Sequence, residues 1–166
     1  EVKQFWQSSM LDPKDLPFDL KNMPDVFTRF RQDIERKGLS HTKPIEIPKH
    51  IPPLPSEKTL INQQKNLTSN KGNPHFRGGE LSALTHLSQY FDRRLPDTYK
   101  QTRNQLIGMD YSSKFSPWLA LGACSVRVIA EKLRAYEAMN GANDGTYWLW
   151  FELLWRDYFR FLHFKY

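Results

Sequence analysis

Three serines and a lysine stand close together in residues 110–121, which read Asp-Tyr-Ser-Ser-Lys-Phe-Ser-Pro-Trp-Leu-Ala-Leu. The polar set is Ser112, Ser113, Lys114 and Ser116. Proline lacks an N–H that would be unpaired at a helix start, so this order predicts a helix with Ser116 as N-cap and Pro117 as its first residue. The free N–H groups of a first helical turn favour anions, so the set could hold a phosphate. The same pattern also fits an ordinary capped helix start that binds nothing.

A second charged group lies in the last helical pattern, residues 146–166, which holds ten of the 23 aromatic residues. Glu152, Arg156 and Arg160 are spaced four apart, so they form one polar stripe on a helix that is otherwise apolar nearly all round. Buried charges are costly unless they are paired, so this stripe needs partners. It indicates either an ion-paired ladder inside a helical bundle or a cavity that Glu152 and Trp155 line.

Helical periodicity predicts most of the elements that must position these residues. Asp25 is expected to cap a helix that ends at Gly38 and has Val26, Phe27, Phe30 and Ile34 on one face. Further helices are predicted over 80–91 with Leu81, Leu84, Leu87 and Phe91 as the apolar face, from an Asp97 cap through Tyr99 and Arg103, and from a Ser125 cap to Asn140-Gly141 with Val126, Ile129, Ala130, Leu133 and Tyr136 as the stripe.

The first half of the chain is less regular. Residues 2–6 have the pattern of a β-strand. From Ser40 to Pro74 the composition changes, because five of the 11 prolines lie between Pro44 and Pro55 and polar residues dominate afterwards. This composition predicts an extended linker.

Composition limits the classes of function. The formal charge of +6 is spread along the chain, so nucleic-acid binding would need a folded basic patch. The single cysteine, Cys124, excludes an internal disulfide and a cysteine-based zinc site. No apolar run is long enough to span a bilayer. The chain opens without Met and stops inside a helical pattern, so we expect a segment of a longer protein.

Three motifs, in this order, resemble the photolyase/cryptochrome family and most closely its cryptochrome DASH branch. They are Tyr-Lys-Gln-Thr-Arg-Asn at 99–104, the stretch at 110–122, and Phe-Glu-Leu-Leu-Trp-Arg-Asp-Tyr-Phe-Arg-Phe at 151–161. The resemblance covers nearly the whole chain. It implies a mainly α fold, with the helical bundle of a photolyase-type FAD-binding domain. Residues 76–166 would form the first part of that domain, 39–75 the interdomain linker, and 1–38 the end of an α/β antenna domain.

The resemblance also implies roles for individual residues. The residues that match FAD phosphate contacts are Tyr99, Ser112, Ser113, Lys114, Phe115 and Ser116, in agreement with the cradle inferred from residue types. Arg156 matches a residue close to the flavin. Glu152 and Trp155 match residues that face a flipped pyrimidine dimer, and Arg103 matches one near the DNA backbone. No metal site is implied. The chain departs from the family pattern at Val126, where Pro is usual, and at Trp150, where an aliphatic residue is common.

The implied activity is light-driven electron transfer from reduced FAD to a cyclobutane pyrimidine dimer, with single-stranded DNA as the substrate because extrusion costs least there. A blue-light signalling or transcription-regulating cryptochrome that binds FAD and DNA without repair stays open, since both need the same pocket. A helical nucleic-acid-binding module without flavin is a third class, which an absorption spectrum would distinguish.

The remaining expectations follow from the same resemblance. A folate antenna, methenyltetrahydrofolate, would be held mainly by parts of the α/β domain outside this chain. The protein is expected to be a monomer that does not bind membranes, in the cytoplasm of a bacterium or in an organelle or nucleus of a eukaryote. These 166 residues alone are expected to be inactive and to bind FAD weakly or not at all.

Overall fold

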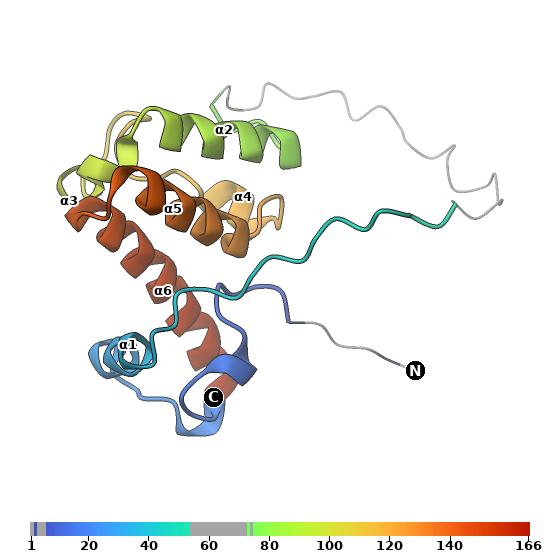
Figure 1. Cartoon of the computed structure of the whole chain (residues 1–166), viewed down its shortest axis with the longest axis vertical. Coiled ribbons are helices and arrows are strands. Elements are labelled where there is room, and N and C mark those ends of the chain that lie inside the picture. Colours follow the sequence, from blue (N-terminus) through green and yellow to red (C-terminus); the bar gives the residue numbers. More distant parts are fainter. Residues whose placement is uncertain (1, 3–5, 54–72, 74) are drawn as a thin grey trace.

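A long helix, α6 (Asp144–Lys165), runs through the molecule and contacts α1, α3 and α5 (Figure 1). The computed structural model describes residues 2, 6–53, 73 and 75–166, and over these residues it is helical and without strands. The other helices are α1 (Phe27–Arg36), α2 (Glu80–Asp92), α3 (Tyr99–Thr102), α4 (Ser116–Ala120) and α5 (Val126–Asn140), and the 3-10 turns are η1 (Pro13–Asp15), η2 (Leu20–Asn22) and η4 (Leu95–Thr98). The predicted mainly helical fold is confirmed.

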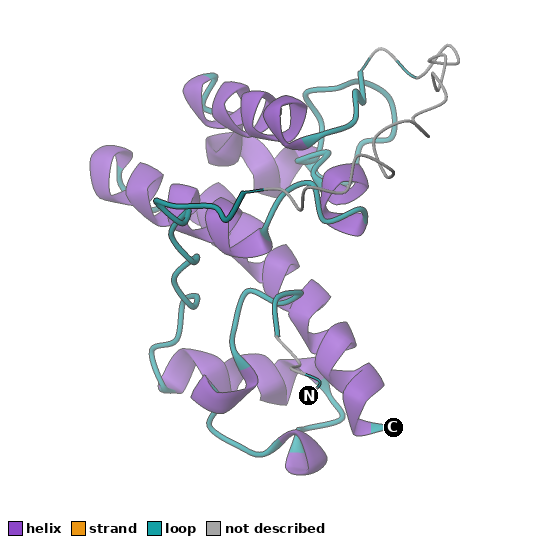
Figure 2. Cartoon of the chain, turned by 90° about the vertical axis from the view of Figure 1, so that its right-hand side faces the viewer, coloured by secondary structure: helices purple, strands orange, loops and turns teal. Residues whose placement is uncertain are grey.

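Helix α6 connects two groups of elements. Its first half packs against α3, α5 and η4, and α2 lies on α5 and η4 (Figure 2). Helix α1 packs along α6 from Tyr147 to Tyr158, and η2 also contacts α6. The Tyr158 hydroxyl donates to the Asp25 carbonyl at 2.6 Å. Its buried side chains include Leu149, Trp150, Leu153, Leu154, Tyr158 and Phe161. Each group therefore has its core along the same helix.

A capping box starts α6 two residues before the predicted position. The Asn143 side chain accepts from the N–H groups of Gly145 and Thr146 at 2.8 and 3.0 Å, and the Thr146 hydroxyl accepts from the Asn143 N–H at 3.0 Å. Gly145 lies against η4 so closely that a Cβ there would be 2.2 Å from the Pro96 carbonyl oxygen. Only glycine allows this approach of α6 to η4.

The two ends of α1 differ in how well the sequence predicted them. Gly38 ends the helix as expected: its φ is 70°, and the N–H groups of Gly38 and Leu39 bond to the carbonyls of Glu35 and Ile34. The predicted Asp25 cap is wrong, because Val26 is the N-cap and no side chain caps the helix. The Asp25 carboxylate instead accepts from Lys165 and from the Tyr166 hydroxyl at the end of α6.

The predictions for the middle helices are partly confirmed. In α5 the expected stripe is buried, and the Ser125 side chain accepts from the Arg127 N–H at 3.2 Å. In α2 the bounds agree to one residue, but Leu81 is 83% exposed and the buried face is Ala83, Leu87, Tyr90 and Phe91. The predicted Asp97 cap is wrong, because its carboxylate accepts from Tyr136 and Asn143, at 2.7 and 3.0 Å, rather than from the following N–H groups.

The irregular first half is bonded to the helices where it is described. Residues 3–5 of the predicted strand lie outside the described residues, and Val2 and Trp6 are not in a strand. The predicted linker has neither helix nor strand over 40–53, and its remaining residues are, except for Asn73, outside the described part. The Trp150 indole N–H donates to the Ser40 carbonyl at 2.9 Å, which fixes the start of this segment on α6. None of the helices described is long and apolar enough to cross a membrane.

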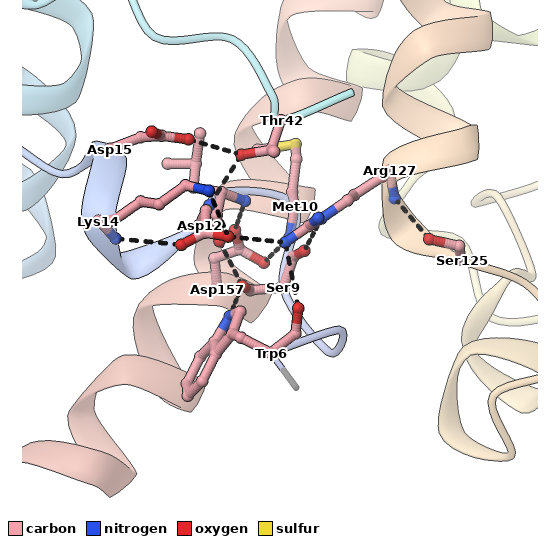
Figure 3. Close-up of polar contacts among 11 residues, drawn as sticks. Trp6, Ser9, Met10, Asp12, Lys14, Asp15, Thr42, Ser125, Arg127 and Asp157 are labelled. Atoms are coloured by element: carbon pink, nitrogen blue, oxygen red, sulfur yellow. Dashed lines mark hydrogen bonds and ion pairs between the residues drawn. The ribbon is translucent and has the colours of Figure 1, made fainter. Parts of the chain in front are cut away.

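A fully buried carboxylate joins the N-terminal segment to α6. Asp157 accepts from the Met10 and Leu11 N–H groups at 2.9 and 2.8 Å (Figure 3). The buried Arg127 of α5 donates to the Ser9 carbonyl at 3.1 Å, so the same segment is bound from two helices. Burial raises the pKa of Asp157 to about 7, and its two backbone donors oppose this shift. Sequence reasoning did not identify this residue.

Asp157→Asn tests this contact through pH. In the unfolded chain an aspartate titrates near 3.9, so the raised folded pKa contributes stability that is complete below that pH and is lost as pH rises through about 7. Asparagine presents N–H₂ to one of the two donors, so we expect a loss of about 1 to 3 kcal/mol at pH 5. The difference from wild type should shrink by pH 8 in urea unfolding. The exposed Asp19→Asn is the control, and a pH-independent difference would contradict the assignment.

Candidate functional site

The loop before α4 has a strained backbone. Ser112 and Lys114 have φ of 58° and 56°, in the left-handed region that costs a residue other than glycine about 1 to 2 kcal/mol. Residues 112–114 are half-buried and Phe115 is buried. Such strain persists only where the surrounding structure holds it, and it concentrates at functional sites.

The helix that follows differs from the prediction. Helix α4 starts at Ser116, its N-cap is Phe115, and no side chain caps it. The prediction that Ser116 is the N-cap is therefore wrong, and Pro117 is the second helical residue. The helix has only five residues, so its dipole is small and an anion here would depend on the loop's own donors.

Tyr99 and the loop lie together. Tyr99 is buried at the start of α3, and burial first, then the charge of Glu152, raises the pKa of its hydroxyl to about 12. The Ser113 side chain opposes the shift, so it is close to the same hydroxyl. Tyr99 therefore stays a neutral hydrogen-bonding group beside the loop.

Glu152 pairs with Arg103 across the gap between α6 and α3. Arg103 donates to the carboxylate, and its guanidinium lies over the Trp148 ring at 4.3 Å. Both side chains are half-buried, and burial raises the pKa of Glu152 while Arg103 lowers it. The structure thus pairs Arg103 with Glu152, both of them predicted substrate contacts, and the charge of Glu152 acts on Tyr99, a predicted FAD contact.

Trp155 lies in an aromatic stack. Its ring is parallel to Phe27 of α1 at 3.6 Å between centroids, and it also stacks on Phe159 at 5.4 Å. Trp155 is half-buried, so its contact with α1 supports a packing role. The predicted contact with extruded bases stays a prediction.

Arg156 is placed apart from the loop. It donates to the Ser8 carbonyl at 2.6 Å, and burial, followed by repulsion from Arg160, lowers its pKa. The two arginines border a hollow of about 770 Å³ whose lining contains neither Tyr99 nor residues 112–116. Among the described residues the stripe forms no continuous ion-paired ladder, which was one of its two alternatives, because Glu152 pairs with Arg103 and Arg156 donates to a backbone carbonyl.

The residues that hold the loop from α2 were missed. Arg93 forms a bidentate pair with Asp110 at 2.7 and 2.6 Å, and His86 contacts the Ser113 carbonyl at 2.9 Å. Their helical spacing was visible, but nothing in the sequence indicated that α2 faces this loop. No group of three or more potential metal ligands is found among the residues described.

Known proteins are similar to this chain over nearly its whole length. No protein-family model matches. Cryptochrome DASH of Gloeobacter violaceus (strain ATCC 29082 / PCC 7421) is 44% identical over 169 residues, covering 97% of this chain and 34% of that protein. Over its own length, the chain belongs to the photolyase/cryptochrome family.

Two further members agree with this placement. The crystal structure of Synechocystis sp. PCC6803 cryptochrome matches with a TM-score of 0.77 at 39% identity, over 98% of this chain and 35% of that one. A rice (Oryza sativa subsp. japonica) relative, named cryptochrome DASH, chloroplastic/mitochondrial, is 40% identical over 100% of this chain and 30% of its own length. The chain thus spans about a third of these cryptochromes.

Trp155→Ala tests the packing role. Removing a large aromatic from the Phe27 stack should lower the free energy of unfolding by about 3 kcal/mol, the low end for buried tryptophan because the ring is half-buried. Urea unfolding of the chain measures this. Phe159→Ala is the matched control, because this ring is 60% exposed and its loss should cost less. Equal, small losses in both variants would contradict the packing role.

Proposed function

We propose that this chain forms part of the flavin and substrate sites of a cryptochrome of the DASH type, which repairs cyclobutane pyrimidine dimers in single-stranded DNA with light. The observation that carries the proposal is the strained loop of Ser112, Ser113 and Lys114 beside the buried Tyr99 hydroxyl. Serine hydroxyls, a lysine ammonium and backbone in the left-handed region suit a phosphate oxygen. The donor set therefore fits the diphosphate of FAD.

Each residue would contribute by binding or orientation. The hydroxyls of Ser112 and Ser113 would donate to phosphate oxygens, Lys114 would balance their charge, and Tyr99 would stay protonated at physiological pH. FAD itself would supply the light absorption and the electron. Arg156 would approach the flavin from the hollow that it borders, whose lining does not include the loop.

The proposed substrate contacts are Arg103, Glu152 and Trp155. Arg103 would attract the DNA backbone, Glu152 would accept from a base edge, and Trp155 would stack on an extruded base. Single-stranded DNA fits this role because no paired strand has to be opened.

A second candidate function is blue-light signalling without repair. Glu152 is already paired with Arg103, and the Trp155 ring is already stacked on Phe27, so both groups have protein partners. A protein in which these pairs persist would bind flavin through the loop but would present no free substrate contacts.

Repair activity separates the two candidates. In a chimera that carries this chain in place of the matching 35% of the Synechocystis cryptochrome, blue light should remove dimers from single-stranded DNA, as measured by chromatography of the digested strands. The dark reaction is the control. A chimera that is loaded with flavin and shows no light-dependent loss of dimers would favour signalling.

Lys114→Glu tests the phosphate contact in the same chimera. Replacing a cation by an anion beside a phosphate should reduce the bound flavin, read from its absorbance after purification, by about tenfold or more. The control is Lys49→Glu, a charge reversal at an exposed position in the irregular segment. Wild-type flavin occupancy in Lys114→Glu would show that Lys114 is an ordinary solvated lysine.

A further inference from the structure

Helix α2 contacts the candidate loop at three points. His86 and Tyr90 are spaced four apart on one face of the helix, and Arg93, three residues further on, is its C-cap residue. Arg93 binds Asp110 at the start of the loop, Tyr90 packs edge-on against Phe115 at 5.1 Å, and His86 contacts Ser113 in the middle. The loop is therefore held at its start, middle and end by one rigid element.

His86 is held more firmly than a surface histidine. Its ring is stacked on Trp118 at 4.9 Å with 29° between the planes, and it meets Phe115 edge-on at 5.6 Å. The Trp118 indole N–H is in turn fixed by the Arg77 carbonyl at 2.8 Å. Since the Ser113 carbonyl can only accept, Nε2 of His86 must carry the proton that joins them.

This hydrogen bond fixes the direction of a neighbouring donor. The Ser113 carbonyl and the Lys114 N–H belong to one planar, trans peptide unit, so they point in opposite directions. With the carbonyl directed at His86 on α2, the Lys114 N–H is directed away from α2. Among the described residues no backbone acceptor pairs with that N–H.

We infer that His86 is a positioning residue that orients the Lys114 N–H toward a bound phosphate. This rests on the proposed function, because the loop must be the phosphate site. His86 itself need not touch the ligand. Its donor compensates for the left-handed backbone at Ser112 and Lys114, which would otherwise relax to a conformation with a different N–H direction.

The test compares His86→Phe with His86→Gln in the 166-residue chain. Phenylalanine keeps the stack on Trp118 and removes the donor, whereas the glutamine amide can place an N–H near the position of Nε2. Without ligand, amide hydrogen exchange over residues 111–116 should become about tenfold faster in the Phe variant and stay near wild type in the Gln variant. His50→Phe, at an exposed position, is the control. If the Phe variant loses its helical circular dichroism, His86→Asn, whose amide is too short, replaces it.

The same variants in the flavin-free Synechocystis chimera, titrated with FAD, separate the two levels of the proposal. Affinity about tenfold weaker in the Phe variant and restored in the Gln variant supports both the positioning role and the phosphate site. Faster exchange in the Phe variant alone, with the FAD affinity of the chimera unchanged by either substitution, supports the positioning of the loop and counts against its role as phosphate site. Unchanged exchange in the Phe variant, or equal acceleration in both variants, overturns the inference.

Discussion

The carboxylate of Asp157 is the interaction on which the arrangement of the chain depends. It is fully buried, and it accepts from two consecutive backbone N–H groups of a segment almost 150 residues away, Met10 and Leu11. No neutral side chain of this size can accept from both without presenting a donor of its own. The burial cost of the charge is the reason for its raised pKa. Arg127 completes the connection by binding the carbonyl of Ser9, so donors and acceptors of one turn are satisfied from two helices.

The candidate site depends on the helices that pack around its loop. The loop at Ser112–Lys114 cannot hold its left-handed conformation alone, and α4 after it is too short to impose it. Helix α2 supplies the restraint from one side, and the buried Tyr99 of α3 lies near it on another. The strained segment is therefore placed between elements that are themselves packed on α5 and α6, which is the arrangement that preorganised binding sites require.

The sequence predicted those features that depend on local spacing. The buried stripe of α5 and the glycine at the end of α1 were predicted because a helix face and a left-handed turn are determined by neighbouring residues. The caps assigned to Asp25 and Asp97 were wrong, because each carboxylate is used by groups distant in sequence, Lys165 in the first case and Tyr136 in the second. The sequence alone does not show whether a short polar residue before a helix caps that helix or binds a group distant in the sequence.

The same limit applies to the site. The proximity of Tyr99 to Ser113 was predicted from the resemblance to a known family, since the thirteen intervening residues leave their distance open. The spacing of Glu152, Arg156 and Arg160 predicted that this stripe needs partners, but it could not identify Arg103 as the partner of Glu152. The contact of Trp155 with Phe27 likewise depends on how α1 packs, which no pattern within either helix determines.

The close approach of Gly145 to η4 has a mechanical consequence for the rest of α6. Because Gly145 has no side chain, the start of the helix contacts the Pro96 and Asp97 backbone directly. This end of α6 therefore cannot move closer to η4. The helix extends about 30 Å from Gly145 to Lys165. If the helix tilted by about two degrees about Gly145, Lys165 would move by about 1 Å. The effect of such a tilt would therefore be largest at Lys165, which binds the Met23 carbonyl and the Asp25 carboxylate.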